Sequence, residues 1–120
     1  NREAAEPAPL TPEAKAYVRN LALSNVEMKA TEAYSGQQIV EILGSISNNG
    51  DQPLKIVEVM CVFYDANAQV VARERLSIVK ASGKSLSPGD TRPFRLPFDS
   101  LPTTWNQTLP QLVIANIVFE

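Results

Sequence analysis

The sequence predicts an all-β protein, an antiparallel immunoglobulin-like β-sandwich of six to seven strands with a short N-terminal helix. From about residue 21, apolar and polar side chains alternate with a period of two, as they do in half-buried strands. Clusters of Asn, Asp, Gly and Pro separate these segments, and 120 residues are enough for one domain with a single core. Short strands joined by turns are typical of sandwiches, and a barrel is the main competing fold.

The N-terminal segment differs in composition from the rest of the chain. Residues 1–12, NREAAEPAPLTP, contain three Pro, three Ala and two Glu, which favours a semi-extended tether. Thr11 as N-cap and Pro12 at the first helical position predict one or two helical turns over residues 13–19. We therefore divide the chain into a tether with a short helix (1–17) and a sandwich domain (18–120). Whether the tether leads from an upstream membrane anchor or is a disordered end stays open at this point.

The first two predicted strands cover residues 21–33 and 40–47. The apolar positions of the first strand change phase near Ser24 and Asn25. Gly44 interrupts the second strand, which indicates a bulge or a close approach of another chain segment. The sequence Asn-Asn-Gly-Asp at 48–51 then predicts a turn.

The third predicted strand, residues 54–64, is the most hydrophobic segment of the chain. One face carries Val57, Val59, Cys61 and Phe63. The other face carries Glu58 and the apolar or aromatic side chains Met60, Val62 and Tyr64. Because both faces are largely apolar, we expect a central strand that is covered on both sides or borders an interface.

Three further strands are predicted after the turn at residues 65–68. They cover 69–79, 94–98 and 111–120, and Ser87-Pro88-Gly89-Asp90 before the second of them is typical of a type II turn. The prolines of the 94–98 strand place it at a sheet edge, because proline cannot donate a ladder hydrogen bond. In the 69–79 strand, one face carries Val70, Ala72, Leu76 and Ile78 together with Glu74, opposite a solvated face. In the last strand, one face carries Val113, Ala115, Ile117 and Phe119.

Composition excludes several functional classes. The chain has no histidine and one cysteine, which rules out His-based catalysis, most zinc sites and an internal disulfide. A net charge of -2 gives no broad basic footprint for nucleic acid. No apolar run is long enough to span a bilayer, and the first residues lack the apolar core of a signal peptide. We predict no catalytic residue and no cofactor or metal site, and hence a protein that is not an enzyme.

Cys61 and Asp65 could take part in chemistry by residue type, and we assign structural roles to both. Cys61 lies on the inward face without a histidine to activate it, so we expect an inert packing residue. Asp65 begins a turn, where its carboxylate typically accepts a hydrogen bond from the backbone two residues later. A weak calcium site at the loop ends, built from Asp51, Asp65 or Asp99, stays open as a minor alternative.

Three short motifs lie between residues 38 and 98: Gly44-Ser45-Ile46-Ser47-Asn48, then Tyr64-Asp65, then Leu86-Ser87-Pro88-Gly89 before Phe94. Together they resemble the FxLYD-type domains of bacterial envelope proteins. The chain departs from the family pattern at Cys61, Phe63 and Ala68, where Phe, Leu and Gly are usual. The segments at 23–26 and 102–106 are similar to bacterial domains without assigned function that follow one membrane helix. The resemblance implies an immunoglobulin-like sandwich outside the cytoplasm, and no catalytic residues.

The favoured hypothesis is a non-catalytic interaction or spacer module of a membrane-anchored bacterial protein. It would be extracytoplasmic, in the periplasm or cell envelope, behind an anchor upstream of this chain, with another envelope protein as partner. Candidate interaction residues are Trp105, Tyr34, Met60 and Tyr64. The alternative is a small-ligand or polysaccharide-binding module that uses Trp105 and Tyr34 as stacking platforms. Trp105 has a structural interpretation too, as a plug at one end of the sandwich.

Overall fold

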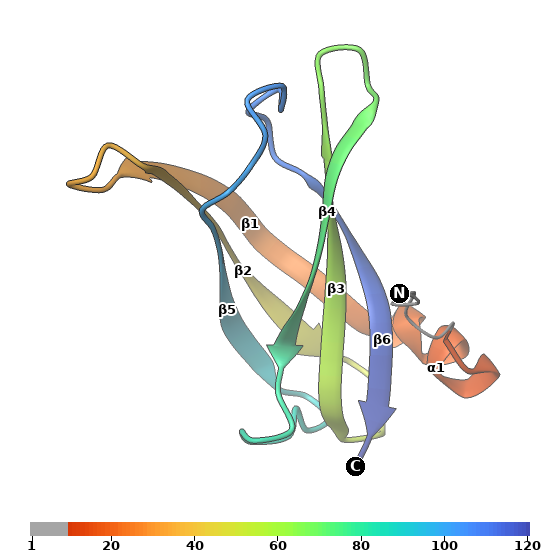
Figure 1. Cartoon of the computed structure of the whole chain (residues 1–120). Helices are drawn as coiled ribbons and strands as arrows, with labels where there is room; N and C mark the ends of the chain where they lie inside the picture. The colour runs from red at the N-terminus through yellow and green to blue at the C-terminus, as the bar shows by residue number, and fades with distance from the viewer. Residues whose placement is uncertain (1–9) are drawn as a thin grey trace.

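The computed structural model describes residues 10–120, which form two three-stranded antiparallel sheets packed face to face (Figure 1). The elements in chain order are α1 (Pro12–Tyr17), the 3-10 turn η1 (Val18–Asn20), β1 (Leu21–Glu32), β2 (Gln38–Asn48), β3 (Leu54–Tyr64), β4 (Val70–Val79), β5 (Thr91–Phe98) and β6 (Gln111–Phe119). The predicted tether falls mostly outside the described residues. Within residues 10–120, no helix has both the length and the apolar character that crossing a membrane requires.

The strand orders are β1-β2-β5 in one sheet and β4-β3-β6 in the other. The hairpins β1-β2 and β3-β4 each stay within one sheet, and β5 and β6 then join opposite sheets, as the crossing connections of an immunoglobulin-like sandwich do. The predicted all-β sandwich is therefore confirmed, with six strands and one short helix. Two separate sheets exclude the barrel.

The core lies between the two sheets and is built from alternate residues of the central strands. Phe63 of β3 meets Phe98 of β5 edge to face, with ring centroids 5.1 Å apart, and meets Trp105 in the same way at 5.7 Å. The predicted inward face of β3 is confirmed, because all four of its residues are fully buried: Val57, Val59, Cys61 and Phe63. β3 lies between β4 and β6, as its two apolar faces predicted.

The faces assigned to β4 and β6 are partly wrong because register shifts against β3 interrupt the alternation of both strands. The register of β6 against β3 shifts between the Glu58 and Val59 pairs, so Ile117 points inward while Val113 lies opposite Met60 on the outer face. A shift between Phe63 and Tyr64 likewise places Val70 opposite Tyr64. Val113 and Val70 are accordingly exposed, by 44% and 41%. An extra residue reverses the alternation, which a strict period of two cannot represent.

The irregularities predicted in the first sheet are confirmed. β1 shifts register between Ser24 and Glu27, and Asn25 adopts a φ of 53° there. Opposite this bulge, a Cβ at Gly44 would lie 2.7 Å from the ring of Phe94, so the glycine admits a close approach. β5 is an edge strand as predicted, although it begins three residues earlier, at Thr91.

The predicted turns and the helix start are confirmed. Gly89 has a φ of 86°, and the Asp90 N–H donates to the Ser87 carbonyl at 3.0 Å, as in a type II turn. The Asp65 carboxylate accepts hydrogen bonds from the N–H groups of Asn67 and Gln69. Thr11 caps α1 by accepting from the Ala14 N–H at 3.1 Å.

Candidate interaction surface

The outer face of the β4-β3-β6 sheet carries apolar and aromatic side chains, mostly from β3 and β6, in two groups separated by the polar row of Glu58, Ser77 and Asn116. The cross-strand register places Met60 opposite Val113, and Ile56 opposite Val118. We call this set the outer sheet surface, and its apolar members are Ile56, Met60, Val62, Tyr64, Val70, Val113 and Val118. In Figure 1 the β4-β3-β6 sheet lies in front of the other sheet, and α1 lies to the side, beyond β6.

This surface follows from the unusual composition of β3. A strand with one solvated face normally alternates apolar and polar residues. In β3 the outward positions include Met60, Val62 and Tyr64, each of which is half-buried by its neighbours on the sheet. Val113 and Val118 of β6 extend the apolar area and are exposed. Apolar side chains on three adjacent strands mark a sheet face suited to contact with another molecule.

Glu58 supplies a polar centre within the outer sheet surface. Its Oε1 accepts hydrogen bonds from Arg75 Nη2 at 2.8 Å and from Asn116 Nδ2 at 3.2 Å, so β4 and β6 both contact it. The Arg75 guanidinium is the main cause that lowers the pKa of the Glu58 carboxyl, against the opposing effect of burial. The pair fixes an ionised carboxylate between the Ile56–Val118 and Met60–Val113 pairs, on a face whose β4 side also carries Arg73 and Ser77.

β6 also differs from the other three edge strands of the sandwich. β1 contains a bulge and charged residues, β4 contains Arg73, Glu74 and Arg75, and β5 contains two prolines and two arginines. Such features discourage pairing with another chain. β6, with the sequence QLVIANIVF, has neither charge nor proline. Of the features that discourage pairing with another chain, it has only the bulge near Ala115. Tyr17 of α1 contacts Phe119 at one end of this edge.

The four predicted interaction residues do not form one site. Met60 and Tyr64 lie together on the outer sheet surface, and the Tyr64 hydroxyl donates to Gln111 Oε1 at 2.7 Å. Tyr34 is fully exposed in the loop between β1 and β2 of the other sheet. Trp105 is only 7% exposed and packs on Phe63, so it is a plug at the end of the core rather than an exposed anchor. Burial of its large apolar ring accounts for this placement.

Cys61 and Asp65 have the structural environments expected of them. Burial raises the pKa of the Cys61 thiol to about 12, with a smaller contribution from the nearby Glu74 carboxylate. Asp65, one of the three calcium candidates, already accepts two backbone hydrogen bonds in its turn. Within residues 10–120, no group of three or more Cys, Asp or Glu side chains is arranged to hold a metal ion.

Sequence reasoning missed the part of the surface that β6 contributes. Val113 was assigned to the same face as Ile117, and the bulge near Ala115 is what places the two residues on opposite faces. A usable indication was nevertheless present, because the predicted strand 111–120 has no proline and no charge before its last residue, Glu120. Glu58 was placed on the outer face, but its partners from β4 and β6 depend on strand order and register.

No protein-family model and no curated protein matches the sequence. Among solved structures, the chain is similar to a Bordetella pertussis protein provisionally named ApaA. The two share 20% sequence identity over 82% of this chain and 90% of that one, with a TM-score of 0.48. A similarity at this level assigns neither family nor function. The resemblance to FxLYD-type domains therefore stays a prediction.

Proposed function

We propose that this protein is a non-catalytic interaction module that binds another protein through the outer sheet surface. The observation that carries the proposal is the run of uncovered apolar side chains over β3 and β6. Burying such side chains against a partner is favourable by about 25 cal/mol per Å² of apolar surface. The Glu58–Arg75 pair would add a polar contact that fixes the orientation of the partner.

The uncharged edge of β6 favours a protein partner over a small ligand. Its first half, Gln111–Ile114, has no neighbouring strand on that side, so its backbone groups are available to an added strand. Exposed Val113 lies on both the edge strand and the outer sheet surface. A partner that contributes an extended segment could therefore use both features at once.

Chemical composition supports a module without catalysis. The chain has no histidine, and its one thiol is buried with a raised pKa. The polysaccharide-binding alternative loses its main support because Trp105 is in the core and unavailable for stacking.

An extracytoplasmic location behind an upstream membrane helix is part of the proposal. It is supported by the Pro- and Ala-rich composition of residues 1–12 and by the resemblance of the motifs between residues 38 and 98. The partner would then be another envelope protein. The location is tested by fusing the natural full-length protein to a reporter that is active only outside the cytoplasm. An inactive reporter would contradict the extracytoplasmic location.

The interaction is tested by photo-crosslinking from position 113 in cells that produce the protein. A crosslinkable residue at Val113 should capture a discrete partner, whereas the same residue at exposed Thr31 on β1 should not. The captured protein is then purified and its affinity measured. Val113→Lys should weaken binding at least about tenfold by placing a charge in the apolar contact, a loss of about 1.4 kcal/mol.

Thr31→Lys is the matched control, since it adds the same charge to an exposed strand position of the other sheet. Both variants should unfold at nearly the wild-type denaturant concentration. Equal capture from both positions, or equal affinity of the two lysine variants, would show that the outer sheet surface does not bind.

A further inference from the structure

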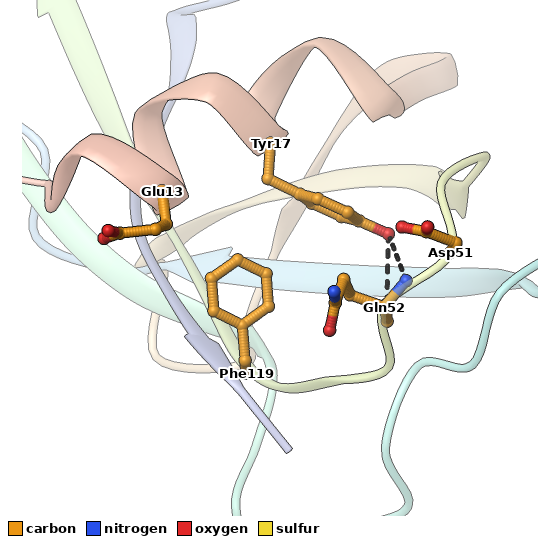
Figure 2. A pocket seen from close by; sticks show the side chains of 5 residues that line it. All are labelled: Glu13, Tyr17, Asp51, Gln52 and Phe119. Carbon is orange, nitrogen blue, oxygen red and sulfur yellow. Dashed lines mark hydrogen bonds between the residues drawn. The ribbon is translucent and has the colours of Figure 1, made fainter.

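A pocket of about 340 Å³ lies at the other end of β6, between α1 and the turn that joins β2 to β3. Figure 2 shows its lining, which consists of Glu13, Tyr17, Asp51, Gln52 and Phe119. Three separate parts of the chain supply these residues: α1, the β2–β3 turn and the last residue of β6.

The aromatic part of the lining is rigid. The rings of Tyr17 and Phe119 meet edge to face, with centroids 5.4 Å apart and planes at 87°. The Tyr17 hydroxyl donates to Asn48 Oδ1 at 2.6 Å and accepts from the Gln52 N–H at 3.0 Å. Because both ends of Tyr17 are held, the aromatic wall exists before any ligand binds, which lowers the cost of binding.

The charged part of the lining has one sign. Glu13 and Asp51 both carry exposed carboxylates, and in Figure 2 they lie on opposite sides of the Tyr17 ring. Within residues 10–120, neither forms an ion pair with a Lys or Arg side chain. The pocket thus combines negative charge at its rim with an aromatic wall, in which half-buried Phe119 offers the accessible ring because Tyr17 is only 7% exposed.

We propose that this pocket binds the guanidinium group of an arginine side chain presented by a partner protein. A planar cation can contact an aromatic ring while its N–H groups donate to carboxylates, and arginine does both. The two carboxylates disfavour free arginine, because its own α-carboxylate would be repelled. This inference does not depend on the outer sheet surface, and either site can exist without the other.

The test uses the full chain and three small probes. N-acetyl-arginine methylamide should give saturable NMR shifts confined to the ring protons of Tyr17 and Phe119 and to the neighbouring Gln52 amide. The citrulline analogue has the same shape but no charge, and should bind at least about fivefold more weakly. Free L-arginine should also bind more weakly than the blocked probe. Raising the salt concentration should weaken arginine binding and leave the citrulline probe nearly unaffected.

Variants that remove a charge test which carboxylates bind the arginine probe. Asp51→Asn and Glu13→Gln should each weaken binding of the arginine probe about threefold, and the double variant about tenfold. Glu27→Gln removes the same charge from an exposed position on β1 outside the pocket and should have no effect. Val113→Lys on the outer sheet surface should leave affinity within about twofold, which separates failure of this inference from failure of the proposed function.

The inference would be overturned by equal affinity for the arginine and citrulline probes. It would also be overturned by shifts spread over the whole acidic surface without saturation, or by a Glu27→Gln effect as large as that of Asp51→Asn. Binding of free L-arginine as tight as that of the blocked probe would contradict the assignment to a side chain within a protein.

Discussion

Asn48 connects three parts of the molecule that are distant in sequence. Among residues 10–120 it is the one fully buried polar side chain, and its amide group is completely hydrogen-bonded. Nδ2 donates to the carbonyls of Gln52 and Leu86, and Oδ1 accepts from the Tyr17 hydroxyl and the Gly50 N–H. A Cβ at Gly50 would overlap the Tyr17 ring, so the glycine is required for this arrangement.

Replacing Asn48 should therefore be costly. We expect Asn48→Ala to lower the free energy of unfolding by about 3 kcal/mol, because it leaves several buried groups without partners. Asn49→Ala is the matched control, since the neighbouring asparagine is exposed, and should cost less than about 0.5 kcal/mol. Urea denaturation of both variants measures the difference. A similar loss for the two would contradict a special role for the buried amide.

Because the Cys61 thiol is buried, we predict that it reacts slowly in the folded protein. Folding raises its pKa from 9.0 to about 12, so the native thiol stays protonated where the unfolded one ionises. At pH 8, native protein should react with iodoacetamide at least about 100-fold more slowly than urea-unfolded protein. Fast alkylation of the native protein would show that the thiol is accessible.

The raised pKa of Cys61 also determines how the stability of the protein changes at alkaline pH. Between pH 9 and the folded pKa, the unfolded chain loses the Cys61 proton first, so ionisation favours unfolding and stability falls as pH rises. Below pH 9 this group contributes no pH dependence. The Cys61→Ala variant lacks the effect, so the stability difference between wild type and variant should shrink above pH 9. A difference independent of pH would contradict the raised pKa.

At the scale of single elements, α1 is too short to be stable without its contacts. It has six residues, and Ala14 and Tyr17 are the two that it buries. Thr11→Ala removes the N-cap hydrogen bond and should cost about 1 kcal/mol. Amide hydrogen exchange should accelerate about fivefold within residues 14–18, while amides of β3 keep their rates. Thr104→Ala, at an exposed loop position, is the control. Equal acceleration in β3 would show that α1 does not open locally.

The strands show which parts of the fold the sequence predicted correctly. β3 was predicted with correct bounds, because an eleven-residue hydrophobic segment lies between two strong turns. β4 and β6 were located, but their faces were partly misassigned. Local alternation cannot reveal a bulge, whose extra residue is accommodated only by the pairing with β3. The positions of Val70 and Val113 were therefore wrong even though their strands were right.

For the whole molecule, the two sheets should unfold together because they share one core. Phe63 contacts Phe98 of the opposite sheet and Trp105 of the last loop. Phe63→Ala should lower the free energy of unfolding by about 4 kcal/mol. The transition followed by Trp105 fluorescence should still coincide with that followed by far-UV circular dichroism. Val113→Ala, at an exposed position, is the control and should cost below about 0.5 kcal/mol. Separate transitions for the two signals would contradict a shared core.

The sequence by itself determined the class of fold, most strand positions, the turns and the inward position of Cys61. These properties depend on side-chain alternation and backbone preferences within a few residues. Only the tertiary structure decided that Trp105 is buried, that Val113 faces outward, and that Glu13, Asp51 and Phe119 border one pocket. Each of these depends on contacts between segments far apart in the chain, and those contacts are fixed by strand order, register and the packing of the two sheets.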